Sequence, residues 1–329
     1  MNFGEIDNIL LLGGGNIFAK TSLFLEKINL HANIIISNSQ KDEIVDDKNK
    51  LTLEQFLNRN NKQYYISNDI NKDPLIRDMI NDNTLGFSIN ARWLIKNNFI
   101  DLLQGRIVNI HGANLPKHRG GGGYSWRIMS DDRTAGVCIH LIDSGIDTGD
   151  ILLNKDYEFS KDYSKPIDYY KFAEKKMEAL IQTFFNKIIN KDNFTSIKQD
   201  NDKSSYWPRL STDKNAFINW GWSVKEIHRF ICAFDDPYGG CKTYINDELV
   251  HIKSSSIYST EMEHHPYQAG IIIRKNSKGY FVAIKDGMLL VSNIVGNNKK
   301  SVKVRIGDRL FTPRRVLDQG MAKRIIYKP

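Results

Sequence analysis

The segment NILLLGGGNIF, residues 8–18, joins a short apolar run to three successive glycines and then to a helical pattern. Asn8–Leu12 is predicted to be a strand, and the glycines at positions 13–15 predict a tight turn, because glycine accepts backbone conformations that other residues avoid. Ile17–Leu30 then carries apolar residues at helical spacing. A strand, a glycine turn and a helix in this order are typical of the first unit of an α/β sheet.

The same alternation of strand and helix patterns continues along the chain. Strands are predicted at Asn33–Ser37, Gln63–Ser67, Leu85–Ile89, Arg106–Ile110, Val137–Ile142 and Ile151–Leu153. Helices are predicted at Leu51–Asn58, Leu75–Asn81 and Trp93–Leu103, and a long one after Pro166. This order predicts a doubly wound, mostly parallel sheet, in which functional loops follow the carboxyl ends of the strands.

The pattern changes after a polar segment at residues 192–205. Ser223 and Glu226 have the form of a helix capping box, and apolar residues follow at helical spacing as far as Phe234. Beyond it, β-like segments are predicted at residues 242–244, 250–253, 269–273, 280–284, 288–295 and 309–311. We therefore predict two domains: an α/β domain with its linker at residues 1–205, and a smaller β-rich, barrel-like (OB-like) domain at residues 206–329.

Composition limits the classes of function. No apolar run has the length of a membrane span, and Met1–Leu12 carries no basic leader, so we expect a cytoplasmic protein without membrane contact. The three cysteines show no CxxC spacing, which argues against a structural zinc site. The net charge of +8 suits anionic ligands, but it is scattered along the chain and supports nucleic-acid binding only weakly.

Two polar loops follow predicted strands and contain residues suited to catalysis. Asn109 and His111 lie two positions apart, so on an extended backbone their side chains point the same way. Amide and imidazole groups can stabilise the oxyanion of a tetrahedral intermediate, and the carboxylate of Asp147, in the second loop, can take up a proton. Each residue alone is more typical of a turn or a hydrogen-bonded structural position. Only in combination do they supply the groups that an acyl transfer needs.

These residues resemble the motif of the formyltetrahydrofolate-dependent formyltransferases. The motif is Asn-x-His, then Leu-Pro with a basic and glycine loop, and later an Asp-x-Gly segment. The chain has Asn109-Ile110-His111, Leu115-Pro116-Lys117-His118-Arg119-Gly120 and Asp147-Thr148-Gly149, with 147 − 111 = 36 positions between His111 and Asp147. The resemblance covers residues 6–190. It implies transfer of a formyl group from N10-formyltetrahydrofolate to an amine by Asn109, His111 and Asp147, without a metal.

The resemblance also implies where the two ligands bind. The folate pterin is expected between the segment 87–95 and the loop 142–147, with Arg92, Trp93, Leu94, Ile95, Ile142 and Asp143 as contacts. Ordinary helix packing explains Trp93 and Leu94 equally well. The acceptor is expected on the other side, with Gly14, Gly15, Asn16, Lys117, Arg119 and Tyr124 as contacts. The segment GGGNIF is only a broken dinucleotide fingerprint, which argues against an NAD(P) enzyme.

The acceptor amine stays open between two classes. Ser39–Lys50 contains four acidic residues against three lysines, which is poor for binding a phosphate backbone. Together with the Gly120–Gly123 run, this favours a nucleotide-linked amino-deoxysugar used in surface polysaccharide (O-antigen, lipopolysaccharide) synthesis. Methionyl-tRNA formyltransferase is the alternative. A non-catalytic protein that binds folate or a nucleotide sugar, and hydrolysis of formyl-folate, are lesser alternatives. We expect a homodimer.

Overall fold

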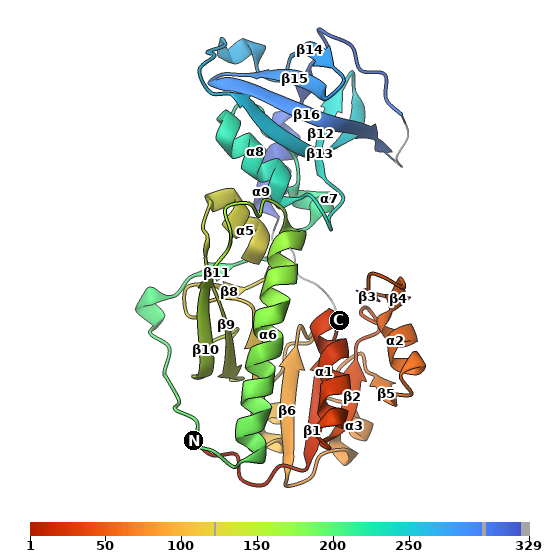
Figure 1. The fold of residues 1–329 in the computed structure, drawn as a ribbon, viewed down its shortest axis with the longest axis vertical. Helices are drawn as coiled ribbons and strands as arrows, with labels where there is room; N and C mark the ends of the chain where they lie inside the picture. Colours follow the sequence, from red (N-terminus) through yellow and green to blue (C-terminus); the bar gives the residue numbers. More distant parts are fainter. Residues whose placement is uncertain (122, 298–300, 324–329) are drawn as a thin grey trace.

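The computed structural model describes residues 1–121, 123–297 and 301–323. Gly122, within the glycine run, and the last six residues of the predicted second domain lie outside them. Within the described residues, a seven-stranded sheet occupies the N-terminal part of the chain and a six-stranded sheet the C-terminal part. Figure 1 shows the two sheets at opposite ends of an elongated molecule.

The N-terminal sheet has the strand order β10-β9-β7-β6-β1-β2-β5. Its strands are β1 (Asn8–Gly13), β2 (His31–Ile36), β5 (Tyr64–Ile66), β6 (Thr84–Ile89), β7 (Ile107–His111), β9 (Thr134–Leu141) and β10 (Ile151–Glu158). Five strands that are neighbours in the sheet, β7, β6, β1, β2 and β5, are parallel to one another. β9 runs antiparallel to both of its neighbours, β7 and β10. The prediction of a doubly wound, mostly parallel sheet is therefore confirmed.

Helices cover both faces of this sheet. They are α1 (Gly15–Lys27), α2 (Leu53–Arg59), α3 (Pro74–Asp78), α4 (Asn97–Leu102) and the long α6 (Pro166–Ile189). Successive residues of β1 face opposite sides: Leu11 packs in the core that contains residues of α1 and α6, and Leu10 in the core that contains residues of α3 and α4. Both leucines are fully buried, which explains why this strand is a continuous apolar run.

The predicted helix Trp93–Leu103 is wrong at its start, because α4 begins only at Asn97. The buried side chain of Asn71 binds the preceding segment, donating to the carbonyl of Leu94 at 3.0 Å and accepting from the backbone N–H of Lys96 at 2.8 Å. Trp93 packs into the core from this non-helical segment. A contact with a residue 25 positions away therefore overrides the local helical pattern.

The acidic segment Ser39–Lys50 forms most of a hairpin rather than an open loop. Its strands are β3 (Ile44–Asp46) and β4 (Leu51–Thr52), and the carboxylate of Asp46 accepts hydrogen bonds from the backbone of Lys48 and Asn49 in the turn. In Figure 1 the hairpin stands beside α1 and α2. The acidic side chains therefore have defined positions.

Two elements inside the motif loop were not predicted. β8 (Arg119–Gly120) pairs in parallel with β11 (Tyr206–Trp207), and α5 (Gly123–Ser130) follows directly. The glycine run interrupts the helical pattern, and the pairing with β11 joins segments 87 positions apart (206 − 119). The segment after His111, which we expected to be a loop, therefore contains a short strand and is followed by a helix.

The C-terminal part is a curled antiparallel sheet with the order β14-β15-β16-β13-β12-β17. Its strands are β12 (Cys241–Ile245), β13 (Glu248–Ser259), β14 (Ile272–Asn276), β15 (Gly279–Ile284), β16 (Gly287–Gly296) and β17 (Leu310–Phe311). Hydrogen bonds from Ile272 N to the carbonyl of Asp308 (2.9 Å) and from Leu310 N to that of Gly270 (2.8 Å) join the two ends. The predicted β-rich character of this part is confirmed, and its barrel-like (OB-like) form stays a prediction.

The C-terminal helices pack against the rest of the chain. They are α7 (Thr212–Asn215), α8 (Val224–Ala233), with the predicted Ser223/Glu226 capping box, and α9 (Arg314–Ala322). Ser125 of α5 donates a 2.7 Å hydrogen bond to the carbonyl of Ala233, and one apolar core includes both Tyr169 of α6 and Ile227 of α8. The domain boundary at residue 206 stays a prediction. Among the described helices, none combines the length and the apolar character that a membrane crossing requires.

Candidate active site

The fold brings Asn109, His111 and Asp147 to the same edge of the N-terminal sheet. His111 is the last residue of β7, and its Nδ1 lies 3.7 Å from Oδ2 of Asp147. Asp147 lies in the loop after β9 and has a left-handed backbone conformation, with φ of +55°. The backbone N–H of Gly120 donates a 2.9 Å hydrogen bond to Oδ2 of Asp147. The two loops that carry the motif are therefore bound to each other through the Asp147 carboxylate.

Asn109 is oriented by His140, a residue that the sequence analysis did not select. β7 and β9 pair Asn109 directly with His140, and Nδ2 of Asn109 lies 3.2 Å from Nε2 of His140. The other ring nitrogen, Nδ1, lies 2.7 Å from the carbonyl of Leu141, to which it donates. Nε2 is then the acceptor for the amide of Asn109. The neighbouring strand thus holds the Asn109 side chain in one orientation.

His111 has a protein group at each ring nitrogen. Its Nε2 donates to the carbonyl of His118 at 2.8 Å, and its Nδ1 faces the carboxylate of Asp147. The distance of 3.7 Å to Asp147 is too long for a direct hydrogen bond but short enough for a strong charge interaction. The His111 ring therefore contacts both the segment after β7, which contains His118, and the loop that contains Asp147.

The environment of Asp147 keeps its carboxylate charged. Burial on its own raises the pKa of this carboxyl, but His111, His140 and the N–H of Gly120 together hold the pKa below its usual value of 3.8. Arg209 also lowers it. A carboxylate that is ionised at neutral pH and only 17% exposed is suited to accept a proton from a reacting group beside it.

One further residue that the sequence analysis did not select, Gln199, supports the Asp147 loop. Gln199, which is buried, donates to the carbonyls of Asp147 at 2.9 Å and Gly149 at 2.7 Å. Its own side-chain oxygen accepts from Nε and Nη2 of Arg119, at 3.1 and 2.9 Å. A Cβ at Gly149 would lie 1.9 Å from the carbonyl oxygen of Leu141, so this close approach requires glycine. These contacts fix the backbone from which Asp147 projects.

Burial of His140 predicts a loss of stability in mild acid. Burial lowers the pKa of His140 from 6.5 to about 4, against the opposing effect of Asp147. Between these two pH values the unfolded chain binds more protons than the folded one, so the free energy of unfolding falls as the pH falls from 6.5 to about 4, by roughly 3 kcal/mol from this group. His118, whose pKa burial also lowers to about 4, acts in the same direction.

Urea unfolding at pH 7 and pH 4.5 checks this prediction. In His140→Gln the side-chain oxygen can still accept from Asn109, and the difference between the two pH values is expected to shrink but not to vanish. The matched control is His31→Gln, a change at an exposed histidine, which should retain the wild-type difference. An unchanged pH difference in His140→Gln would contradict a neutral, buried His140.

The residues predicted to contact folate lie near one another but differ in exposure. Trp93 is buried, and Ile95 and Ile142 pack against the same core cluster, so the two segments of the predicted pterin slot do meet. Leu94 is 70% exposed. Arg92 forms an ion pair with Glu43 at 2.5 Å, and the carboxylate of Asp143 accepts from the backbone of Gly145 and from Thr148. The side chains of Arg92 and Asp143 therefore both have protein partners.

Several of the predicted acceptor contacts are buried and have protein partners in the structure. Gly14 is buried under the side chain of Gln40 and donates its N–H to the carbonyl of Ile89 at 3.1 Å. Arg119 is buried with Gln199, and Tyr124 is buried among aromatic rings. The side chains of Arg119 and Tyr124 contact other protein groups, because β8 and α5 pack against the rest of the protein and are not exposed loops. Lys117 is exposed, Gly15 is half-buried and Asn16 lines a groove, so these three stay predicted contacts.

This groove has a volume of about 720 Å³ and lies between α1, the β3–β4 hairpin and α6. Four carboxylates and two lysines line it: Glu43, Asp46, Asp47 and Glu174, with Lys20 and Lys171. We call it the acidic groove. Asn16 donates to Glu174 at 2.8 Å across it. Tyr170, also in its lining, stacks edge-on against Tyr124, whose hydroxyl lies beside Gly112, the residue after His111. Tyr170 therefore connects the lining of the acidic groove, through Tyr124, with the residue that follows His111.

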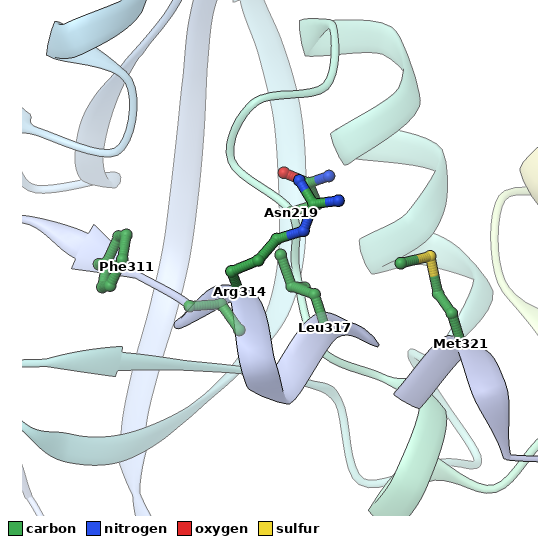
Figure 2. Close-up of a pocket in the computed structure, with 6 residues that line it drawn as sticks. Asn219, Phe311, Arg314, Leu317 and Met321 are labelled. Carbon is green, nitrogen blue, oxygen red and sulfur yellow. The ribbon is translucent and has the colours of Figure 1, made fainter. Parts of the chain in front are cut away.

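A smaller hollow of about 280 Å³ lies in the C-terminal part, beside α9 (Figure 2). Its lining residues are Asn219, Phe311, Thr312, Arg314, Leu317 and Met321. Arg314 is the one charged residue in this lining, so the hollow has no pair of groups for acid–base chemistry. Over the described part of the chain, no group of three or more His, Cys, Asp or Glu residues could hold a metal ion.

Comparison with protein families assigns both parts of the chain. The model of the family described as "Formyl transferase" matches residues 7–184, and that of "Formyl transferase, C-terminal domain" matches residues 211–306. Methionyl-tRNA formyltransferase of Ruminiclostridium cellulolyticum is 28% identical over 64% of this chain and 66% of its own length. The enzyme of the same name from Clostridium novyi is 27% identical over 74% of this chain and 78% of its own.

Solved structures with the same fold carry other names. WlaRD, a sugar 3N-formyl transferase solved with dTDP and 5-N-formyl-THF, has a TM-score of 0.66 and 24% identity, over 90% of this chain and 100% of that one. The N-formyltransferase from Helicobacter canadensis, in complex with folinic acid and dTDP-3-aminofucose, has a TM-score of 0.66 and 21% identity, over 88% and 99%. At these identities the likeness establishes the fold.

Proposed function

The chain belongs to the formyl transferase family, and on this premise we propose that it moves the formyl group of N10-formyltetrahydrofolate onto the amine of a nucleotide-linked amino-deoxysugar. The observation that carries the proposed chemistry is the cluster of Asn109, His111 and Asp147 at one edge of the sheet. A charged carboxylate lies 3.7 Å from an imidazole there, and a positioned amide lies on the same strand.

The proposed reaction needs no covalent enzyme intermediate. The uncharged amine attacks the formyl carbon, and the carbonyl electrons move to oxygen as the new C–N bond forms. Asn109 uses one amide hydrogen for His140, which leaves the second for the oxyanion. Collapse of the intermediate restores the carbonyl and breaks the bond to N10 of the folate. The proton lost by the amine passes to Asp147, directly or through a water, and is returned to N10.

His111 has to exchange a partner before it can contact the oxyanion. Both of its ring nitrogens face protein groups, the carbonyl of His118 and the carboxylate of Asp147. We assign the stabilising contact to a ring N–H of His111 that gives up the His118 carbonyl when substrate binds. His118 lies in the loop between β7 and β8, so movement of this loop is sufficient.

The acidic groove favours the sugar acceptor over tRNA. Its four carboxylates would repel the phosphates of an acceptor stem, whereas carboxylates and amides suit the hydroxyl and amino groups of a sugar. Burial raises the pKa of Glu174, whose carboxylate accepts a hydrogen bond from Asn16. The dTDP and dTDP-3-aminofucose in the two solved relatives support the same acceptor class, and their formyl-folate compounds support the donor.

Methionyl-tRNA formyltransferase is the second candidate, and a specific observation favours it. The sequence relatives from Ruminiclostridium cellulolyticum and Clostridium novyi both have that name and match 64% and 74% of this chain. The appended C-terminal domain does not separate the two candidates. Use in surface polysaccharide synthesis, a homodimer and a cytoplasmic location stay predictions.

A binding screen distinguishes the acceptors. With a stable folate analogue present, we expect saturable binding of one of the dTDP-, UDP- or GDP-linked amino sugars, and formylation of that sugar when the analogue is replaced by N10-formyltetrahydrofolate. Initiator methionyl-tRNA is expected to bind weakly, with affinity that falls steeply with salt. Tight binding and formylation of the tRNA alone would overturn the sugar assignment. Folate binding without transfer to any acceptor would point to the non-catalytic alternative.

A further inference from the structure

The segment after α8, Asp235-Asp236-Pro237-Tyr238, is held against the start of α6 by polar contacts. The backbone N–H of Ile167 donates to the carbonyl of Asp236 at 2.9 Å. Lys165 forms ion pairs with Asp235 at 3.2 Å and with Asp236 at 3.6 Å. Figure 1 shows α6 extending from this contact with the C-terminal part along the N-terminal sheet. The two parts of the chain therefore meet at a defined place.

The same segment is also fixed from within the C-terminal part. The carboxylate of Asp235, a residue only 1% exposed, accepts from the backbone N–H of Ser254 at 3.1 Å. The carbonyl of Asp235 accepts from the backbone N–H of Tyr238 at 2.9 Å, and Asp236 forms an ion pair with Lys253 at 2.7 Å. Tyr238 therefore projects from a turn that is held from both sides.

This turn contributes to the lining of the acidic groove. Pro237 lines the groove, and all its other lining residues belong to the N-terminal part. Four of them lie on one face of α6, at the spacing i, i+3, i+4 and i+7: Ile167, Tyr170, Lys171 and Glu174. The groove that we assign to the acceptor is therefore completed by a residue of the C-terminal part.

Tyr238, the residue after Pro237, forms a hydroxyl pair with Tyr170 of the groove lining. The two hydroxyl oxygens lie 3.0 Å apart at an exposed position. Each tyrosine hydroxyl has one hydrogen, and the pair uses one of the two. One O–H therefore stays available to donate, and the oxygens can still accept. A sugar hydroxyl both donates and accepts, so it can use both capacities of this pair.

We propose that Tyr170 and Tyr238 bind the sugar of the acceptor by hydrogen bonds, so that the C-terminal part contributes directly to the acceptor site. This inference rests on the proposed function, because it takes the acceptor to be a nucleotide-linked amino-deoxysugar. The two tyrosines are assigned to binding and specificity, and the chemical step stays with the catalytic residues.

Aromatic contacts connect this tyrosine pair with the catalytic strand. The ring of Tyr170 lies edge-on to that of Tyr124, with 4.8 Å between the ring centroids. A Cβ at Gly112, the residue after His111, would lie 3.0 Å from the hydroxyl of Tyr124. A sugar held by Tyr170 is therefore bound on the side of α6 that contacts the catalytic loop.

Binding of dTDP-, UDP- and GDP-linked amino sugars, each compared with the nucleoside diphosphate alone, tests the pair. With a stable folate analogue present, Tyr170→Phe and Tyr238→Phe are each expected to weaken binding of the nucleotide sugar that the wild type binds. The expected loss is about threefold to tenfold, the usual contribution of one neutral hydrogen bond. Affinity for the nucleoside diphosphate and for the folate analogue should not change, because the aromatic ring is kept.

Steady-state kinetics should show the same separation. The KM for the sugar is expected to rise by the same factor, whereas kcat stays within about twofold, since the contact forms equally in the ground state and the transition state. The matched control is Tyr267→Phe, the same change at a tyrosine of the C-terminal part that is 77% exposed. It should retain the wild-type affinity and KM.

A crystal structure of the complex with the folate analogue and the bound nucleotide sugar gives an independent answer. A hydroxyl oxygen of Tyr170 or Tyr238 within about 3.2 Å of a sugar oxygen is the expected result. Unchanged sugar affinity in both phenylalanine variants, or an equal loss for the nucleoside diphosphate alone, would overturn this inference and leave the proposed function intact. If the wild type binds none of the nucleotide sugars, the proposed function and this inference fail together.

Discussion

His111→Ala is expected to lower kcat by about a thousandfold, because it removes the imidazole that stabilises the oxyanion, and loss of one such donor raises the barrier by roughly 3–4 kcal/mol. KM for folate and acceptor should stay within severalfold, since the contact forms chiefly in the transition state. Both steady-state kinetics and binding of a stable folate analogue measure this difference. The expected loss is therefore in turnover and not in binding.

The controls for His111 separate chemistry from loop structure. His111→Gln can still donate to the carbonyl of His118, which holds the loop in place, so it should fold normally and be nearly as inactive as the alanine variant. His31→Ala, at an exposed position at the start of β2, should retain full activity. Turnover close to that of the wild type in either His111 variant would contradict the assigned role.

Asp147→Asn is expected to lower kcat by about a hundredfold to a thousandfold, within the range that general acid–base groups contribute. The amide oxygen can still accept from the N–H of Gly120, so the loop should keep its shape. The negative charge is lost, and with it the proton acceptor that faces His111. Binding of folate and acceptor should change by no more than severalfold.

The pH profile identifies the reason for this loss. Because His111 and His140 hold the pKa of Asp147 below 3.8 against the effect of burial, the wild-type carboxylate stays charged throughout the usual assay range. The asparagine variant should therefore be impaired at every pH from 6 to 9, and raising the pH should not restore activity. Asp156→Asn, an exposed change on β10, is the matched control. Recovery of turnover at high pH in Asp147→Asn would contradict a charged proton acceptor.

The order of strands and helices followed from local patterns alone. The apolar run before Gly13 and the periodic helix after it predicted β1 and α1, and the repeated alternation predicted the parallel sheet. The predictions were wrong where a distant contact overrides the local pattern. Trp93 and Leu94 lie outside a helix because Asn71 binds the backbone around them. α5 was missed because glycines hide its helical spacing, although packing against α8 stabilises it.

The motif residues were predictable because their signal is local, whereas their partners were not. Asn109 and His111 are two positions apart on one strand, and Asp147 stands at a characteristic separation from them. His140 became relevant only when β9 paired antiparallel with β7 and placed it opposite Asn109. Gln199 lies 80 positions from Arg119, and no spacing along the chain indicates that it joins Arg119 to the Asp147 loop.

The sequence by itself determined the fold class, through the alternation that begins with the strand and glycine turn of positions 8–18, and it indicated the reaction type through the Asn109/His111/Asp147 motif and the family that it resembles. Backbone periodicity and side-chain chemistry are properties of short segments, so a single sequence displays them. Only the tertiary structure decided that Gly14, Arg119 and Tyr124 are buried and that the acidic segment lines a groove. It also decided that the buried Arg127 faces the carboxylate of Asp132 at 3.8 Å. Burial and pairing depend on which distant segments pack together, and that information is not contained in any local pattern.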